Sequence, residues 1–154
     1  MMTKYFYDSY AIIEYLNGNP YYQKYFIESE GITSFYNLME VYYSLLKDNA
    51  EDKANELLIL FKHIIVEPLI DDIKNSMKFR FKYRKIKFSY ADCLGYAIAK
   101  RSNFKFLTGD EGFRDVKNVE FVSFRVRNRN LVFLRLLHQN LTECSGLSLN
   151  YKGR

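Results

Sequence analysis

The sequence predicts an α/β protein, a three-layer α/β/α sandwich with a central, mainly parallel sheet. Short apolar segments rich in aromatic and β-branched residues alternate along the chain with longer segments of helical period. Such alternation is typical of parallel sheets, because the crossover helices cover both faces of the sheet. At 154 residues and 48% hydrophobic composition, the chain can bury one sizeable core but not two ordinary ones. We therefore expect one folded domain.

The first half of the chain is expected to supply two strands and four helices. The segment "KYFY" (4–7) is predicted as a buried strand, followed by a helix that ends at Asn17 and Gly18. A second helix is expected near Pro20, since proline is favoured in the first helical turn. The segment "GIT" (31–33) is a short strand before a third helix, and "EDKANELLILFKH" forms the fourth. One apolar face of the third helix is predicted from Phe35, Leu38, Met39, Tyr42, Leu45 and Leu46.

The second half is expected to add three strands and two helices. The β-branched run "IIV" (64–66) predicts a strand, and "PLIDDIKNSMKFRFKYRK" predicts a basic helix with Pro68 near its start. The segment "SYADCLGYAIAKRSN" predicts the last helix of the domain. The remaining elements are a strand at 104–108, a turn at 109–113 and a strand at 119–122.

Charge is distributed unevenly between the predicted domain, residues 1–122, and a C-terminal extension, residues 123–154. The extension carries six basic residues and one acidic residue, a net +5 that equals the net charge of the whole chain. Residues 1–122 balance at 17 basic and 17 acidic residues. Overall charge is therefore no argument for nucleic-acid binding by the domain. We expect the extension to be partly helical or disordered.

Several classes of protein are disfavoured by the composition. No segment approaches the run of about 20 apolar residues that spans a bilayer, so we expect no membrane partner and a cytoplasmic protein. The two cysteines stand far apart, which argues against a disulfide framework or a zinc site. The chain also has no glycine-rich phosphate loop, and Asp8 lacks the second aspartate of a haloacid-dehalogenase phosphatase.

Three carboxylates stand where predicted parallel strands end or an adjoining helix begins, namely Asp8, Asp92 and Asp110. Each has an ordinary interpretation: an N-cap for Asp8, a capping box for Asp92 and a turn residue for Asp110. Parallel topology, however, gathers these positions at one edge of the sheet. Two carboxylates about 4 Å apart repel by roughly 4 kcal/mol at an effective dielectric near 20. A divalent cation would offset this repulsion, and oxygen ligands favour Mg²⁺ or Mn²⁺ over zinc.

Glu40 has no special status by pattern. On a helical wheel it lies almost opposite the predicted apolar face, which predicts a solvated side chain.

The order of these acids nevertheless resembles the PIN-domain family, in particular the VapC-type toxins of toxin–antitoxin pairs. The resemblance covers about residues 4–122 and depends on "TSFYNLMEVYYSLL", "YADCLGYAIAK" and "FLTGDEGF" together with Asp8. It implies a PIN-like fold and an Mg²⁺- or Mn²⁺-dependent endoribonuclease. It also implies that Asp8, Glu40 and Asp92 hold metal directly or through water, with Asp110 as a fourth, more variable acid.

The resemblance has further implications for the site and for partners. Ser34 and Thr108 stand where the family often has hydroxyls that line the site, and both are candidate substrate-binding residues. Family members often have an acid at the position of Gly112, so Glu111 or Asp115 could take its place. A small antitoxin protein and a homodimer are the expected partners. The many tyrosines and phenylalanines are also consistent with a partner surface.

Residues 74–88 hold seven basic residues and no acid, interleaved with aromatic residues. One interpretation is a contact for RNA, because basic side chains would hold the phosphate backbone beside the acids. The alternative is a solvated basic face over an ordinary core of Ile73, Met77 and Phe81. The candidate RNA contacts share one helical stripe: Lys74, Lys78, Lys82 and Lys85.

The sequence thus favours a metal-dependent endoribonuclease that hydrolyses RNA phosphodiester bonds, most simply the toxin of a toxin–antitoxin pair. A catalytically silent PIN-like module that binds RNA or protein is the main alternative, because position 112 lacks an acid. A small-molecule phosphatase on a similar sheet is a weaker one.

Overall fold

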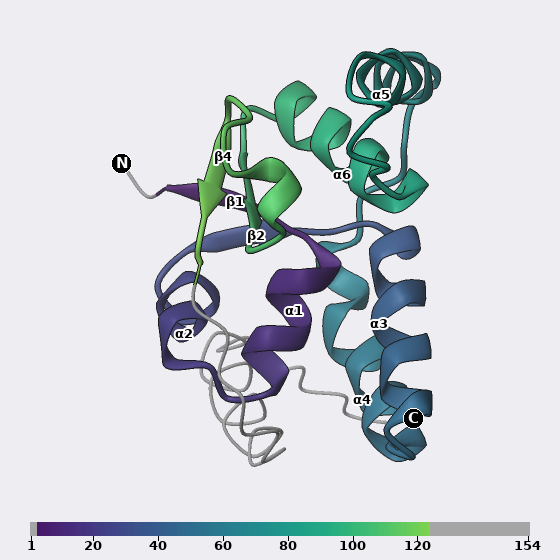
Figure 1. Ribbon diagram of the computed structural model, residues 1–154. Helices are drawn as coiled ribbons and strands as arrows, with labels where there is room; N and C mark the ends of the chain where they lie inside the picture. Colours follow the sequence, from purple (N-terminus) through teal and green to yellow (C-terminus); the bar gives the residue numbers. More distant parts are fainter. Residues whose placement is uncertain (1–2, 124–154) are drawn as a thin grey trace, which may run out of the picture.

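A computed structural model describes residues 3–123 of the chain (Figure 1). In this part of the chain the sheet has four strands in the order β2-β1-β3-β4, and every neighbouring pair is parallel. The strands are β1 (Lys4–Tyr7), β2 (Glu30–Ile32), β3 (Lys105–Thr108) and β4 (Val119–Phe121). All carboxyl ends of the strands therefore lie at one edge, as the sequence predicted. The C-terminal extension lies outside the described residues, apart from Ser123.

Within residues 3–123, six α-helices connect and cover the strands. They are α1 (Ser9–Leu16), α2 (Pro20–Ile27), α3 (Phe35–Lys47), α4 (Glu51–Phe61), α5 (Ile70–Lys82) and α6 (Tyr90–Arg101). Two short 3₁₀ helices complete the described fold, η1 (Lys62–Ile64) and η2 (Glu111–Phe113). In the described residues no helix has the length and apolar character needed to cross a membrane.

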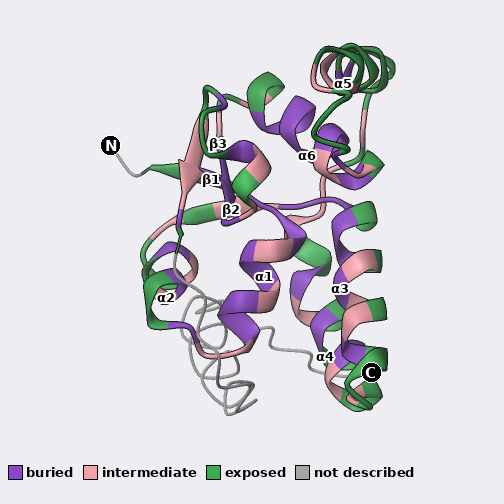
Figure 2. Cartoon of the chain, viewed as in Figure 1, coloured by how far each residue is buried: buried purple, intermediate pink, exposed green. Residues whose placement is uncertain are grey.

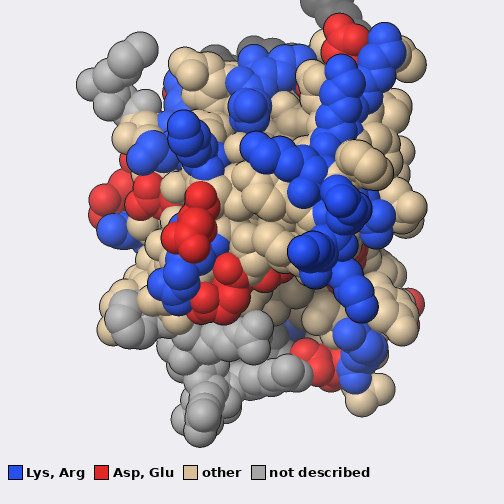
Figure 3. Space-filling model, turned by 45° about the horizontal axis from the view of Figure 1, so that its top comes forward, with Lys and Arg blue, Asp and Glu red and all other residues tan. Residues whose placement is uncertain are grey.

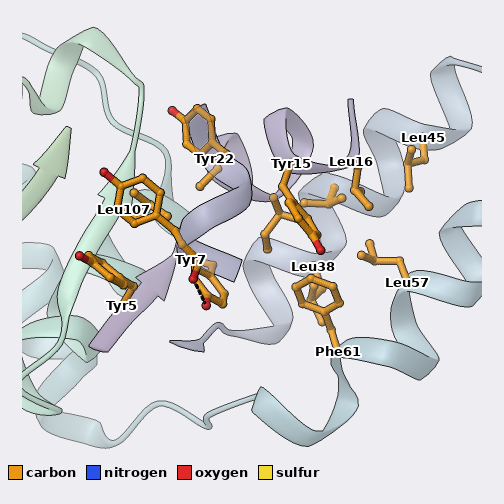
Figure 4. Close-up of a cluster of buried hydrophobic side chains, with 14 of the residues drawn as sticks. Tyr5, Tyr7, Tyr15, Leu16, Tyr22, Leu38, Leu45, Leu57, Phe61 and Leu107 are labelled. Atoms are coloured by element: carbon orange, nitrogen blue, oxygen red, sulfur yellow. Dashed lines mark hydrogen bonds between the residues drawn. The ribbon is translucent and has the colours of Figure 1, made fainter. Parts of the chain in front are cut away.

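The alternation of side chains along the strands divides the core between the two faces of the sheet. Tyr5, Tyr7 and Leu107 pack into a cluster with α1, α2, α3 and α4, which Figure 4 shows in close-up. Phe6 and Phe106 face the other way, into a cluster built mainly on α6. Successive residues of a strand point to opposite faces, so two apolar faces require helices on both sides. This is the expected three-layer sandwich.

Buried tyrosines account for part of the aromatic content. Tyr7, on β1, donates its hydroxyl to the main-chain oxygen of Tyr25 at 2.8 Å, and Tyr22 does the same to Val122 at 3.0 Å. A buried phenol needs such a partner, because an unpaired hydroxyl in an apolar interior costs free energy. The tyrosines therefore fasten α2 to the sheet while they fill the core.

A second aromatic cluster attaches α5 to α6. Phe79 of α5 lies 4.4 Å from Tyr96 of α6 between ring centroids, and Phe88 lies 4.2 Å from Phe113 of η2. Figure 2 shows the result: the middle of α6 is buried beneath its neighbours, whereas α5 is mostly exposed.

The predicted strand at 64–66 is wrong. Residues 62–64 instead form η1 as a continuation of α4, and only one bridge forms, between Thr33 and Ile65. Glu67 and Pro68 follow directly, and a proline has no amide hydrogen to extend a ladder. The β-branched run therefore forms only this parallel bridge, with Thr33 directly after β2.

The predicted apolar face of α3 is also wrong in part. Leu38, Val41 and Leu45 are buried, whereas Phe35 and Met39 are 53% and 65% exposed. The side of α3 that contacts the core is therefore narrower than the apolar face predicted from the sequence. The surplus apolar side chains lie at the surface.

The expected core of α5 does not exist. Ile73 and Met77 are 47% and 37% exposed, and Phe81 is 71% exposed. The buried residues are polar instead, Asp72 and Ser76. The apolar period alone could not indicate this, because α5 packs on another helix and not on the sheet.

Candidate active site

Asp8 lies at the centre of the carboxyl edge, between β1 and the first residue of α1. Its side chain is 2% exposed. One carboxylate oxygen accepts from the Ser9 amide at 2.7 Å and from the Asn37 carboxamide at 3.2 Å. The other accepts from the Thr108 hydroxyl at 2.6 Å. Asp8 is therefore an N-cap, as its ordinary interpretation predicted, but it is also held by two other elements.

The electrostatics of Asp8 show that other acids lie nearby. Burial raises the pKa of this carboxyl well above its usual range, and the negative charges of Asp92 and Glu40 raise it further. Hydrogen bonds from Thr108 and Ser9 act in the opposite direction and lower the pKa. A site that holds a carboxylate in this way stabilises its charged form less than water does.

Glu40 is half-buried and points toward the N-terminal ends of two other helices. One of its oxygens accepts from the Ser9 hydroxyl of α1 at 2.5 Å. The other accepts from the hydroxyl of Ser89, the N-cap of α6, at 3.1 Å. The solvated position predicted by periodicity is thus wrong, because α3 packs beside α1 and α6 on the side that carries Glu40.

Asp92 combines a cap with a place among the acids. The capping box predicted from the sequence is present: the Ser89 amide donates to Asp92 at 2.7 Å, and the Asp92 amide donates to the Ser89 hydroxyl at 3.0 Å. Burial raises the pKa of Asp92, and so do the charges of Glu40 and Asp110, while the bonds from Ser89 lower it. The ordinary and functional interpretations of this residue are therefore compatible.

Asp110 stands at the end of β3, where the Thr-Gly turn places it. It caps η2 by accepting from the Gly112 amide at 2.9 Å, and its own amide donates to the Thr108 hydroxyl at 3.1 Å. The same hydroxyl donates to Asp8. Thr108 therefore connects the two acids at the ends of neighbouring strands.

Small polar residues link all four acids into one hydrogen-bonded network. The sequence reasoning missed two of these residues, Ser9 and Asn37, and identified Ser89 only as part of the capping box of Asp92. Asn37 is fully buried within α3 and donates to both Asp8 and Ser9. A signal existed, because asparagine is a weak helix former and stands here in an apolar helix. The two serines could not be distinguished from ordinary caps.

The network fits a hard divalent cation by charge and by donor type. In the described part of the chain, the four acids form no ion pair with a basic residue, and the atoms that they could offer to a metal ion are all carboxylate oxygens. Oxygen ligands with an excess of negative charge suit Mg²⁺ or Mn²⁺. Among the described residues, however, no three acidic, histidine or cysteine side chains stand ready to hold an ion together. Each acid is engaged by protein donors instead.

The two predicted hydroxyl residues are fully buried. Ser34 is the N-cap of α3 and donates to the Asn37 carboxamide oxygen at 2.7 Å, so it fixes the orientation of that side chain. Thr108 is committed to Asp8 and Asp110. Both hydroxyls position the acids, and their contact with substrate stays a prediction.

The predicted lysine stripe does not border the acids. Lys74 pairs with Asp71 at 3.5 Å, and Lys78 and Lys82 line a cavity against the C-terminal half of α6. Lys85 lies beyond the end of α5, so the stripe has three members on the helix and not four. Asp92 is at the opposite end of α6.

The packing around Gly112 explains why this position carries no acid. A Cβ atom there would lie 2.7 Å from the ring of Phe88 and 2.8 Å from Ile86. Phe88 is itself buried, so a side chain at position 112 requires the core to move. Glu111 is exposed and pairs with Arg114 at 2.8 Å, and Asp115 is exposed beside α5 and α6. Neither acid joins the network.

Comparisons with known proteins identify the family and the fold of the chain. Residues 5–119 match the family model described as PIN domain. A toxin–antitoxin complex from Klebsiella pneumoniae has a similar fold, with 18% identity, a TM-score of 0.63 and coverage of 79% of this chain and 98% of that chain. VapC20 of Mycobacterium tuberculosis, a toxin that cleaves the sarcin–ricin loop, also has a similar fold. The identity is 15%, the TM-score is 0.61, and the match covers 79% of this chain and 99% of that chain. No curated protein matches the sequence significantly.

Proposed function

The chain belongs to the PIN-domain family, and we propose that it is a divalent-cation-dependent endoribonuclease whose acids are Asp8, Glu40, Asp92 and Asp110. The membership confirms the resemblance seen in the sequence. The observation that carries the proposal is the hydrogen-bonded network of four acids at the carboxyl edge of the sheet. Ligand sites of open parallel sheets lie at this edge.

The chemistry of the network supports a hydrolase better than a structural cap. Caps need single carboxylates at separate helix ends, yet here the charges of Asp92 and Glu40 raise the pKa of Asp8. Bringing like charges together in a buried place destabilises the fold, which is expected where the charges serve a bound cation. Mg²⁺ or Mn²⁺ at these acids would polarise a phosphodiester and lower the pKa of a bound water.

The residues of the chain have distinct roles in this proposal. Asp8 and Asp92 would hold the ion, and the donors around Asp8, which bond to both of its oxygens, fix the orientation of its carboxylate. Glu40, half-buried between Ser9 and Ser89, would accept a proton or orient water. Because each acid is already bonded to the protein, contacts to the ion through water fit the arrangement better than direct ligation by all of them.

The experiment is cleavage of a structured RNA with Mg²⁺ or Mn²⁺, with a chelator, and with the variant Asp8→Asn. Cleavage should require the cation and should be lost in Asp8→Asn. The matched control is Asp71→Asn, since Asp71 is 80% exposed on α5 and remote from the network. Cleavage that survives both the chelator and Asp8→Asn would refute the proposal. Binding of RNA without turnover would favour the silent module instead.

The partners follow from the same proposal: a small antitoxin protein and a second copy of the chain. Exposed apolar side chains on α3, such as Phe35, Met39 and Tyr43, support a partner surface, because lone soluble domains rarely expose such a row. Light scattering of the purified chain should give the mass of a dimer. The variant Met39→Glu should shift the mass to that of a monomer, and a monomeric wild type would exclude the homodimer.

A further inference from the structure

A basic groove lies between α5, α6 and the turn that follows η2. Its volume is about 710 Å³. Lys78 and Lys82 contribute from α5, Lys100 and Arg101 from α6, and Lys117 from the turn, while Asp115 is the one acid among its lining residues. Figure 3 shows lysine and arginine side chains gathered over the part of the surface that α5 covers. We call this cavity the basic groove.

Most of the positive charge in the basic groove is not compensated. Arg101 donates to both oxygens of Asp72, at 2.9 and 2.8 Å, so its charge is paired. The four lysines are exposed, and none of them forms an ion pair in the described part of the chain. Lysines converging from three elements on one concavity produce a positive potential that attracts anions.

Aromatic rings form a packed wall beneath these exposed lysines. Phe79 and Tyr96 are 4.4 Å apart between centroids, and Phe79 and Tyr83 are 4.7 Å apart. The Tyr96 hydroxyl donates to the main-chain oxygen of Lys117 at 2.7 Å, which fixes the turn on α6. The groove is thus built on a packed scaffold, and Phe79 and Tyr83 are only partly buried in it.

The basic groove is separate from the acids but shares a helix with them. Lys100 follows Asp92 by eight residues, which is about 12 Å along α6 at 1.5 Å per residue. Arg80 lies between the two places on α5, where its guanidinium covers the ring of Tyr90 at 4.4 Å and its Nε donates to Phe88. An anion that used both places would therefore have to span at least this distance along α6.

We propose that the basic groove binds the phosphate backbone of an RNA segment that lies outside the cleaved bond. The inference rests on the proposed function for the identity of the polyanion. Flexible lysines with aromatic edges suit a backbone whose bases vary, since lysine contacts to phosphate carry no sequence information. An acidic polypeptide is less favoured, because it would not use the ring edges of Phe79 and Tyr83.

The test measures binding of a labelled single-stranded RNA, in chelator, as a function of salt concentration. The variant Lys78→Gln/Lys82→Gln/Lys100→Gln removes three groove charges. Each phosphate contact to single-stranded nucleic acid contributes about 0.7 to the slope of log K against log salt, so the slope should fall by about 2.

The matched control removes the same charge elsewhere, with Lys24→Gln/Lys47→Gln/Lys62→Gln on α2, α3 and η1. It should leave the slope unchanged. Equal slopes for the two triple variants would overturn the inference. Polyglutamate is measured as a second ligand. If the groove variant lost binding of polyglutamate but kept binding of RNA, the inference would also be overturned, and the groove would be assigned to an acidic protein.

A second measurement separates this inference from the proposed function. An RNA oligonucleotide too short to reach from the acids to the groove should be cleaved equally by wild type and the groove variant, while a long RNA should be cleaved more slowly by the variant. If wild type cleaves no RNA with any cation, the proposed function fails, and the salt slopes still decide whether the groove binds RNA.

Discussion

Asn37 is the residue that joins the separate parts of the acidic network. Its carboxamide donates to Asp8 and to Ser9, and its oxygen accepts from Ser34, so three elements meet at one buried side chain. Outer partners of this kind orient the residues that bind an ion, and their loss typically lowers affinity or activity about 10–100-fold.

The variant Asn37→Ala should therefore lower cleavage by about 10–100-fold. It removes two donors at Asp8 and Ser9 but leaves the four acids in place. The cation concentration at half-maximal rate should also rise, which a merely unstable fold would not cause. Asn55→Ala is the control, because Asn55 is exposed and bonds only to Tyr42 among the described contacts. An unchanged cation dependence in Asn37→Ala would remove its positioning role.

The variant Gly112→Asp tests whether the missing acid can be restored. Overpacking against Phe88 and Ile86 should cost about 1–3 kcal/mol in the free energy of unfolding, measured by urea denaturation. The double variant Gly112→Asp/Phe88→Leu should recover part of the lost free energy of unfolding, because the smaller leucine makes room for the Cβ of residue 112. Gly112→Asp with unchanged stability would show that the core yields there without cost.

Cys93 should be inert in the folded protein. Burial raises the pKa of its thiol to about 12 from an ordinary value of 9.0, so the reactive thiolate is scarce near neutral pH. In a Cys144→Ser background, a thiol reagent should react with Cys93 only after denaturation. This raised pKa also contributes to the stability of the folded protein: the contribution is fully present below pH 9.0 and is lost as the pH rises through about 12. Rapid native labelling near neutral pH would contradict this.

At the scale of elements, α5 depends on α6 for its place in the fold. It buries two polar residues and exposes its apolar ones, so the hydrophobic effect attaches it only through the aromatic cluster around Phe79. Asp72 adds the polar attachment: it accepts from the Leu69 amide at 2.8 Å and pairs with Arg101. The wall of the basic groove depends on both.

Asp72→Ala should destabilise the protein by about 1–3 kcal/mol, because it leaves the amide of Leu69 and the guanidinium of Arg101 without their partner. Its neighbour Asp71 offers a matched control. Asp71 is 80% exposed and lies 3.5 Å from Lys74, so Asp71→Ala should cost less than about 0.5 kcal/mol. Thermal or urea denaturation measures both. Equal effects would show that the Asp72 contacts contribute nothing beyond surface charge.

At the scale of the whole molecule, the acids oppose the stability of the fold that positions them. Asp8 has a pKa raised well above its ordinary 3.8, chiefly by burial. The contribution of Asp8 to stability is therefore fully present below pH 3.8 and is lost as the pH rises through the raised pKa of the folded protein. At neutral pH the network is a destabilising feature that a bound cation would relieve.

In chelator, the variant Asp8→Asn should consequently melt at a higher temperature than wild type. The difference should grow as the pH rises above 3.8, because the unfolded carboxyl is then charged while the native one, whose pKa is raised, resists ionisation. Mn²⁺ should raise the melting temperature of wild type but not that of Asp8→Asn. A variant that melts lower at every pH would mean that the hydrogen bonds of Asp8 outweigh its burial.

Local pattern in the sequence determined the order of the strands and helices, and with it the single edge where Asp8, Asp92 and Asp110 come together. That edge follows from parallel connection alone, since each strand must return to the same end of the sheet. The capping box at Ser89 was equally local, because its partners are three residues apart. Only the resemblance to PIN domains singled out Glu40, whose periodicity predicted solvent.

Tertiary structure alone decided which helix faces meet. It turned Glu40 toward Ser9 and Ser89, buried Asn37 beneath Asp8, and moved the lysines of α5 away from the acids to the far end of α6. It also limited the run at 64–66 to one bridge. The physical reason is that periodicity fixes how a side chain is oriented about its own helix, whereas the neighbour it meets depends on packing across long separations in the chain.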